Sequence, residues 1–327
     1  MKVLVTGASG FLGSHVAEQL SARGDQVRVL VRKSSSRKYL EDLRGIEFAE
    51  GSVDDAESVK RAAAGVDAVV HIAGIVKARN SDEFFATNVG GTQNVLAAAK
   101  ASPSVKRFVF ASSQAVAGPS EDGSPVPIDR DPRPVTNYGR SKLASEQAVL
   151  AEKDRLHVVV IRPPLIYGPR DTATLEFFQW VGRGVRLVYG DGGNTLSVIY
   201  ASDCAAAFVQ ALTADVPSGS RYFVEDGRIH VWRDVIEEIE RAVGKRTFVR
   251  FGIPLKVVKG YAALSEAYGK MTNKAVMVTR DKFNELSQRH WVCDATATRT
   301  ALGWEPKVSL GEGLERTARW YRQEGWL

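Results

Sequence analysis

The chain has 327 residues, of which 44% are hydrophobic and 25% are charged, a composition typical of one large or two medium globular domains and not of a disordered protein. The net charge of +6 suits a polyanionic small ligand, and the lack of a dense Lys/Arg block argues against nucleic-acid binding. Two cysteines, Cys204 and Cys293, cannot form a disulfide framework and indicate a reducing, cytoplasmic compartment.

The first half of the chain alternates short apolar runs with helical patterns. The runs are rich in Val, Ile and Phe, which predicts buried strands at Lys2–Val5, Gln26–Val31, Ile46–Ala49, Asp67–Ile72, Arg107–Ala111 and Leu156–Ile161. Helices are predicted between them at Phe11–Arg23, Asp55–Ala64, Glu83–Ala101 and Asn137–Lys153. This alternation predicts a doubly wound α/β fold, a parallel sheet with helices on both faces. The chain starts with a strand and not with a signal peptide, and we expect no transmembrane segment.

The pattern changes after Arg162-Pro163-Pro164, where Gly-rich turns and single helices replace the alternation. Helices are predicted at Asp203–Thr213, Trp232–Val243, Pro254–Gly269 and Leu310–Arg322. We expect a dinucleotide-binding domain over residues 1–165. A smaller, discontinuous, mainly substrate-binding domain is expected over residues 166–327, with segments near 195–215 returning to the first domain.

A glycine-rich turn joins the first strand to the first helix. Gly7 permits a tight turn, Gly10 lets the backbone approach a pyrophosphate, and Gly13 lets the helix pack close to the strand. The spacing is G-x-x-G-x-x-G and not the G-x-G-x-x-G of ordinary dehydrogenases. The turn predicts a dinucleotide site; a purely structural role for the glycines is the alternative.

The end of the second strand selects the cofactor. An acidic residue here would bind the adenosine ribose of NAD, but residues 26–40 contain no Asp or Glu. Five cations and Ser34 lie there instead, and such a cluster favours the 2′-phosphate of NADP: Arg28, Arg32, Lys33, Arg37 and Lys38. The alternative is a solvated basic surface.

Tyr138 and Lys142 lie four residues apart and share one helix face. A nearby ammonium favours the phenolate, so we expect Lys142 to lower the pKa of Tyr138 and make it a general base. A surface helix pair is the alternative. Ser112 and Ser113 follow a strand at its carboxyl end, where ligands of parallel sheets bind, and either hydroxyl can orient a substrate oxygen.

These motifs together resemble the extended short-chain dehydrogenase/reductase superfamily, the NAD(P)-dependent epimerase/dehydratase-like group with a Rossmann-type fold. The resemblance spans nearly the whole chain and rests on seven segments: TGASGFLG at 6–13, HIAG at 71–74, NVGGTQNVL at 88–96, SSQAVAG at 112–118, YGRSK at 138–142, RPPLIYGP at 162–169, and LGWEPKVSLGEGLERTARWY at 302–321.

The resemblance implies a role for each matching residue. Tyr138 is the general acid/base, Lys142 holds the nicotinamide ribose, and Ser113 is the catalytic serine, with Ser112 as the alternative. Asn88 is a fourth catalytic candidate. Further cofactor contacts are implied at Ser9, Phe11, Leu12, Val53, Ala73, Gly74, Pro163 and Leu165. Such proteins commonly dimerise through the helices that hold Asn88 and Tyr138, so a homodimer is expected.

Three positions depart from the family pattern. Ser52 replaces an acidic residue after the third strand, and Ala117 replaces a tyrosine. Leu196 stands where members that bind nucleotide sugars usually carry an arginine for the pyrophosphate.

The sequence therefore predicts an NADP-dependent reductase of a bulky, hydrophobic ketone, similar to the dihydroflavonol-reductase and 3β-hydroxysteroid-dehydrogenase branch. The alternatives are a nucleotide-sugar epimerase or dehydratase and a non-catalytic NADP sensor. No metal is predicted. The segment 251–278 carries no known motif. Its apolar residues Leu255, Val258, Tyr261 and Tyr268 are expected on one helix face, as core, as a lid or as a peripheral membrane contact.

Overall fold

The computed structural model describes residues 1–327, apart from the side chain of Arg250. At its centre lies a seven-stranded sheet in the order β11-β6-β5-β4-β1-β2-β3. All strands of this sheet are parallel: β1 (Lys2–Thr6), β2 (Gln26–Val31), β3 (Ile46–Glu50), β4 (Ala68–His71), β5 (Arg107–Ala111), β6 (His157–Arg162) and β11 (Ser220–Phe223). The order runs outward from β1 in both directions, which confirms the predicted doubly wound, Rossmann-type fold.

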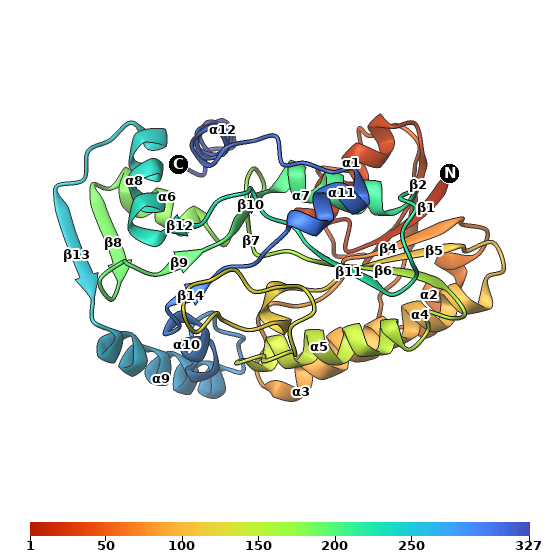
Figure 1. Cartoon of the computed structure of the whole chain (residues 1–327), viewed down its shortest axis with the longest axis horizontal. Helices are drawn as coiled ribbons and strands as arrows, with labels where there is room; N and C mark the ends of the chain where they lie inside the picture. The colour runs from red at the N-terminus through yellow and green to blue at the C-terminus, as the bar shows by residue number, and fades with distance from the viewer.

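Helices cover both faces of the sheet (Figure 1). On β1, Val3 and Val5 belong to one buried cluster and Leu4 to the other, because alternate side chains of a strand point to opposite faces. One face is covered by α1 (Phe11–Ala22) and α7 (Ala201–Ala211), and the other by α2 (Ala56–Ala63), α4 (Gly91–Ala101) and α5 (Asn137–Leu150).

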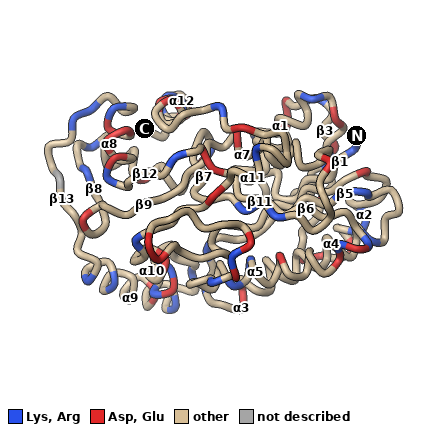
Figure 2. The backbone as a smooth tube through the Cα atoms, viewed as in Figure 1, with Lys and Arg blue, Asp and Glu red and all other residues tan. Residues whose placement is uncertain are grey.

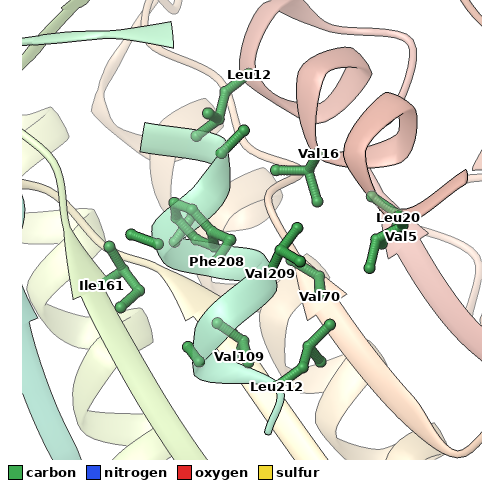
Figure 3. Close-up of a cluster of buried hydrophobic side chains, with 14 of the residues drawn as sticks. Val5, Leu12, Val16, Leu20, Val70, Val109, Ile161, Phe208, Val209 and Leu212 are labelled. Atoms are coloured by element: carbon green, nitrogen blue, oxygen red, sulfur yellow. The ribbon is translucent and has the colours of Figure 1, made fainter. Parts of the chain in front are cut away.

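Residues 201–212 pack on the main sheet although they follow the change of pattern in the sequence. Figure 3 shows Phe208, Val209 and Leu212 among Val16 of α1 and Val109 of β5. Asp203 accepts backbone N–H bonds from Lys307 and Val308, both at 2.8 Å, so this helix also anchors the chain before the last helix.

The helix predicted at Glu83–Ala101 is interrupted by a wider turn. It consists of α3 (Ser81–Phe84), the π-helical turn η1 (Phe85–Gly90) and α4. The hydroxyls of Thr92 and Ser145 donate to the Asn88 carbonyl at 2.6 and 2.9 Å. Such π-turns are frequent at functional sites, and this one holds Asn88 buried below the end of the sheet.

Most of the remaining elements form a smaller part on the left of Figure 1, whereas α11 (Thr296–Leu302) lies right of centre against α7 and β11 of the main sheet. The core of the smaller part joins α6 (Leu175–Gly182), α8 (Trp232–Val243) and α12 (Leu310–Gln323). Short strands pair as β10 (Val198–Tyr200) with β7 (Leu165–Tyr167), β13 (Val249–Ile253) with β8 (Val185–Tyr189), and β9 (Thr195–Leu196) with both β12 (His230–Val231) and β14 (His290–Trp291). Three further helices are α9 (Leu255–Thr272), α10 (Arg280–Leu286) and α11 (Thr296–Leu302).

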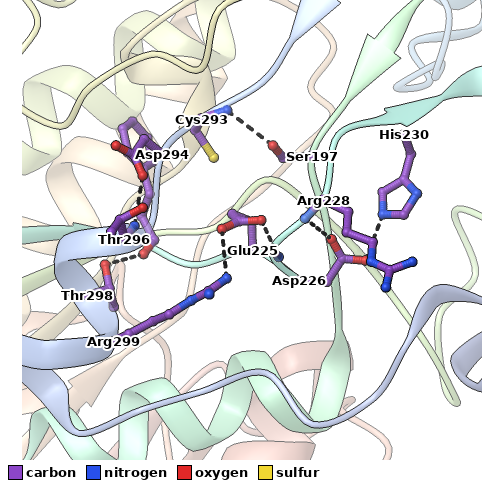
Figure 4. Close-up of polar contacts among 12 residues, drawn as sticks. Ser197, Glu225, Asp226, Arg228, His230, Cys293, Asp294, Thr296, Thr298 and Arg299 are labelled. Carbon is purple, nitrogen blue, oxygen red and sulfur yellow. Dashed lines mark hydrogen bonds and ion pairs between the residues drawn. The ribbon is translucent and has the colours of Figure 1, made fainter.

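Polar contacts tie the segments that run between the two parts (Figure 4). Glu225, just after β11, forms an ion pair with Arg299 of α11 at 3.6 Å. Asp226 contacts the His230 ring at 2.7 Å, and the Cys293 N–H donates to the Ser197 hydroxyl at 3.1 Å. These bonds fix the returning strands against the end of the sheet.

Two expectations for the second half of the chain were wrong or incomplete. Val258 is buried whereas Tyr261 and Tyr268 are exposed, so the apolar residues of α9 lie on two faces and not on one. α6, α10, α11 and the short strands were not predicted. Among the described residues, no helix combines the length and apolar character needed to cross a bilayer.

Candidate active site

The glycine-rich turn lies between β1 and α1 at the carboxyl end of the sheet. Gly7 has φ +77°, and a Cβ there would lie 2.7 Å from the Ala73 nitrogen. A Cβ on Gly13 would lie 2.1 Å from the Gly7 carbonyl oxygen, so the helix approaches the strand as closely as glycine allows. Gly10 caps α1 without a side-chain hydrogen bond, and the first turn holds no acidic residue. The helix start can therefore accept a phosphate.

The residues after Gly7 extend this cradle. Ser9 is partly exposed, Leu12 is buried, and the Phe11 ring stands edge-on to His15 at 5.8 Å. The Ser14 hydroxyl donates to the Phe11 carbonyl at 2.8 Å and so bonds within the first turn of α1.

Some of the cations in and after β2 are paired within the protein, and others are exposed and free to contact a ligand. Arg28 donates to Glu47 at 2.8 Å and to the carbonyls that end α2, and Lys38 pairs with Glu324, so these two do not face a ligand as expected. Arg32, Lys33 and Ser34 are exposed, and across the described residues the side chains of Arg32 and Lys33 have no partner. Arg37 lies over the Phe48 ring at 4.8 Å.

Asn88 holds the loop that follows β4. Its side-chain oxygen accepts from the Ile75 N–H at 2.8 Å, and its nitrogen donates to the Ile75 carbonyl at 3.2 Å and to the Ser141 hydroxyl at 2.9 Å. A Cβ on Gly74 would lie 3.1 Å from the Asn88 oxygen. The amide of Asn88 is thus occupied in shaping the turn at Ala73 and Gly74.

Val53 and Ser52 lie at the same end of the sheet, after β3. The Val53 carbonyl accepts from Asn94 at 2.8 Å, and its side chain packs where a Cβ on Gly91 would lie only 2.8 Å away. Ser52 donates its backbone N–H to the Ser58 hydroxyl at 3.1 Å and its own hydroxyl to Asp54 at 3.2 Å.

Tyr138 begins α5 and is partly buried between two parts of the chain. Burial raises its pKa to about 12; a hydrogen bond from Ser113 opposes this, and the Glu285 carboxylate of α10 adds to it. The Phe84 ring lies 6.2 Å from the Tyr138 ring. Ser113 also accepts from the Ala115 N–H at 3.1 Å, which fixes its hydroxyl at the end of β5.

Lys142 lies one turn further along α5, with its ammonium bonded to the end of β5. Its ammonium donates to the Ala111 carbonyl and lies 4.3 Å from the centre of the Phe110 ring. Burial lowers the pKa of Lys142 to about 7, opposed by Glu146. Its charge does not lower the pKa of Tyr138, which is raised instead. Stabilisation of the phenolate by Lys142 therefore stays a prediction.

The alternative serine, Ser112, belongs to a buried ion pair. Its hydroxyl donates to Glu146 at 2.5 Å, and Arg162 of β6 donates to both oxygens of the same carboxylate at 3.0 and 2.5 Å. Arg162 and Glu146 are 0% and 1% exposed. Ser113, and not Ser112, therefore has a hydroxyl beside Tyr138.

Pro163 and Leu165 follow β6 at the same edge. The Pro163 carbonyl accepts from the Gln114 N–H at 2.8 Å, which joins this segment to the residue after Ser113. Leu165 is exposed in β7. The Gln114 Nε2 is buried and, within the described part of the chain, has no hydrogen-bond partner.

These features fit a nicotinamide dinucleotide. The glycine turn packs its backbone so tightly that no side chain fits at Gly7 or Gly13, which leaves the backbone N–H groups at the start of α1 uncovered by side chains of these two residues, and the buried, unpartnered amide of Gln114 follows Ser113 in the chain. The structure brings the glycine turn, Ala73, Ser113, Tyr138 and Lys142 to one end of the sheet. The motifs did not indicate Phe84, Glu285 or Glu146. These three residues lie outside the motifs, and only the tertiary packing brings them close to the site.

Comparisons with known proteins agree with this arrangement. Residues 3–224 match the sequence model of the NAD dependent epimerase/dehydratase family. The chain is 31% identical to "Ceramide reductase" of Caulobacter vibrioides, over 99% of this chain and 96% of that one. It is 32% identical to "2-alkyl-3-oxoalkanoate reductase" of Stenotrophomonas maltophilia, over 97% and 98%.

A solved structure matches the fold of this chain over nearly its whole length. The dTDP-glucose 4,6-dehydratase DesIV of Streptomyces venezuelae, with NAD and TYD bound, superposes with a TM-score of 0.82 at 26% identity, over 100% of this chain and 98% of that one.

The buried pair generates the first prediction. Replacing Arg162 with Met leaves the Glu146 charge buried and unpaired, and should lower the free energy of unfolding by about 3–5 kcal/mol. Adding Glu146→Leu should recover at least half of that loss. Arg133→Met, which breaks an exposed pair with Glu121, should cost less than about 1 kcal/mol. Urea denaturation measures all three; equal losses for Arg162→Met and Arg133→Met would contradict the assignment.

The second prediction concerns Lys142 and pH. Its pKa is 10.5 in the unfolded chain and about 7 in the fold, so between these values the unfolded chain holds the extra proton. Stability should therefore rise with pH through this window, and below pH 7 the burial of the ammonium costs up to about 5 kcal/mol. The stability advantage of Lys142→Met over the wild type should shrink between pH 6 and pH 10. The exposed Lys60→Met is the control, and an advantage that does not change with pH would refute the prediction.

Proposed function

This chain belongs to the NAD dependent epimerase/dehydratase family of the extended short-chain dehydrogenase/reductase superfamily, and we propose that it is an NADPH-dependent reductase of bulky, hydrophobic ketones. The family performs oxidoreductase chemistry on CH–OH and C=O groups with a nicotinamide cofactor. The preference for NADP, the roles of the site residues and the substrate class are parts of the proposal.

The observation that carries the proposal is the Tyr138–Ser113 pair at the carboxyl end of the sheet. The nicotinamide supplies the hydride when it is bound. Ser113 orients the substrate oxygen, and Tyr138 donates its phenolic proton to that oxygen. Because the pKa of Tyr138 is raised to about 12, the tyrosine keeps its proton at neutral pH, as the role of acid toward a ketone oxygen requires.

Lys142 and Asn88 support this pair in different ways. Lys142 lies on the same face of α5 and would hold the cofactor ribose, replacing its bond to Ala111. Asn88 is a positioning residue, because its amide bonds shape the turn at Gly74 and link it to Ser141 of α5.

NADP is favoured over NAD by the charges after β2. Arg32 and Lys33 are exposed cations that follow directly on the strand end, and Ser34 adds a hydroxyl. A 2′-phosphate would pair with these groups, whereas a ribose hydroxyl would find no acidic acceptor between residues 26 and 40.

Two observations support a hydrophobic substrate. Two relatives are named as reductases of lipid-like compounds, and Leu196 stands at the position where nucleotide-sugar enzymes usually carry an arginine that binds the pyrophosphate. Leu196 packs against the apolar core of the second part. Arg170 pairs with Glu18 and lies over Tyr39, and Arg186 pairs with Glu237. Arg183, a third arginine that could substitute, is exposed and lies 5.6 Å from the centre of the Trp180 ring. The proposal holds that none of the three replaces the arginine that nucleotide-sugar enzymes carry at the position of Leu196.

The alternative reading is a nucleotide-sugar epimerase or dehydratase, as the likeness to DesIV allows. Calorimetry separates the two, since the proposal expects no binding of UDP-hexoses. A sensor without catalysis would not need Ser113, Tyr138 and Lys142 together at one sheet edge.

Cofactor preference is the third prediction. NADPH should bind at least about tenfold more tightly than NADH, a difference of about 1.4 kcal/mol, because the 2′-phosphate is the only added contact. Arg32→Asp should weaken NADPH far more than NADH, whereas Lys38→Asp should have a smaller effect because Lys38 already pairs with Glu324. Fluorescence titration measures each affinity, and equal affinities in the wild type would rule out the NADP assignment.

The fourth prediction tests the acid itself. Tyr138→Phe removes only the hydroxyl, so it should keep NADPH affinity and lose more than about 90% of kcat with a hydrophobic ketone. Ser113→Ala should also lower kcat, while Ser112→Ala should act mainly on stability through Glu146. NADPH oxidation with a panel of ketones gives kcat. If Tyr138→Phe kept more than about a tenth of it, another residue would have to donate the proton.

A further inference from the structure

Helix α9 presents a continuous apolar stripe to solvent. Val258, Ala262 and Gly269 face the protein and are buried. On the outer side five large side chains recur at intervals of four and three residues, the spacing of one helix face: Val257, Tyr261, Leu264, Tyr268 and Met271. Leu264 is 73% exposed and Met271 is 80% exposed, so the stripe is not part of the core.

Neighbouring elements extend the apolar surface. Phe248 is 81% exposed and Phe251 49%, at the strand β13 that leads into α9, on the left of Figure 1. In the described part of the chain fourteen large hydrophobic side chains are exposed, and nine of them lie between Phe248 and Met277. Exposed apolar residues are therefore concentrated at one end of the molecule, which marks an interaction surface.

The positive charge of the protein is concentrated in the same segment. Residues 245–280 contain eight Lys or Arg and one acid, Glu266, a net charge of +7, whereas the whole chain has +6. The rest of the chain is close to neutral. Lys256, Lys259 and Lys270 are exposed and, by helical spacing, share the face of α9 between the stripe and the buried side; Figure 2 marks the lysines of α9 in blue, and Lys270 pairs with Glu266 at 2.9 Å. An apolar stripe bordered by lysines complements the anionic headgroups and acyl chains of a bilayer.

This surface is connected to the candidate active site. The helix that follows, α10, packs against α9, and its Asp281 accepts the Asn137 N–H at 2.9 Å at the start of α5. Glu285 of α10 lies close enough to Tyr138 to raise its pKa. The apolar face and the catalytic tyrosine are thus only one short helix apart.

We propose that the face formed by the α9 stripe, Phe248 and Phe251 docks on an anionic lipid bilayer. The stripe enters the headgroup region while the lysines contact the lipid phosphates. Resting on the proposed function, this contact places the entrance of the site where a ketone with long acyl chains is dissolved, so that the substrate reaches Tyr138 without crossing water.

Vesicle sedimentation tests the contact without any activity. The wild type should bind phosphatidylcholine vesicles that contain phosphatidylglycerol more tightly than pure phosphatidylcholine vesicles, and added salt should weaken the binding. Lys256→Glu/Lys259→Glu and, separately, Leu264→Asp should each reduce the affinity at least about tenfold. The control Lys60→Glu/Arg61→Glu makes the same change of charge on α2, at the other end of the molecule, and should bind like the wild type.

The activity arm distinguishes this contact from the proposed function. Turnover of a long-chain ketone in anionic vesicles should fall in the two α9 variants, while turnover of a short, water-soluble ketone should stay as in the wild type. Vesicle binding that disappears in these variants supports the contact even if no ketone is reduced, in which case the proposed function alone fails. Absent binding, or equal binding by the α9 and α2 variants, would overturn it. So would light scattering that shows Leu264→Asp turning a dimer into a monomer without any vesicle binding, because the stripe would then cover a second copy.

Discussion

The ion pair of Arg162 and Glu146 joins the ends of β5 and β6 to α5, the helix that carries Tyr138 and Lys142. Both side chains are fully buried, and Arg162 donates two hydrogen bonds to one carboxylate that also accepts from Ser112. Glu146 lies two turns beyond Tyr138 on the same face of α5. The pair therefore fixes the helix that carries Tyr138 and Lys142 relative to the end of β5, which carries Ser113, and to the backbone after β6. A buried charge is stable only when it is fully paired. Any shift of α5 relative to β5 and β6 would therefore break the pair and cost free energy.

The low dielectric around this pair explains the protonation states beside it. Burial raises the pKa of Tyr138 to about 12 and lowers that of Lys142 to about 7, so both shifts favour the neutral side chain. The hydrogen bond from Lys142 to the Ala111 carbonyl offsets part of the cost of burying the amino group, and Tyr138 remains a phenol next to Ser113. A site that keeps its tyrosine protonated is prepared to give a proton to a ketone oxygen, and oxidation of an alcohol would first require the phenolate to be stabilised.

The sequence predicted the parts of the fold and site that depend on local patterns. The parallel sheet followed from the alternation of strands and helices, and the glycine turn followed from its spacing, because only glycine fits at Gly7 and Gly13. The partner of Lys142 could not be predicted, since the Ala111 carbonyl lies 31 residues away on another element. The π-turn at Asn88 and the approach of Glu285 to Tyr138 also depend on tertiary packing. On α9 the amphipathic pattern was visible, but not which apolar residues would face the protein. The short strands of the second part have only two to five residues, too few for a periodic signal.

The central claim is that a hydride passes from NADPH to the carbonyl carbon of a hydrophobic ketone while Tyr138 protonates the oxygen. Mass spectrometry of the product formed with NADPH deuterated at the transferable position of nicotinamide C4 tests this most directly. The account predicts an alcohol that carries one deuterium on the former carbonyl carbon, formed by the wild type and lost with Tyr138→Phe. An alcohol without deuterium, or a protein that leaves every hydrophobic ketone unchanged and interconverts UDP-hexoses, would contradict it.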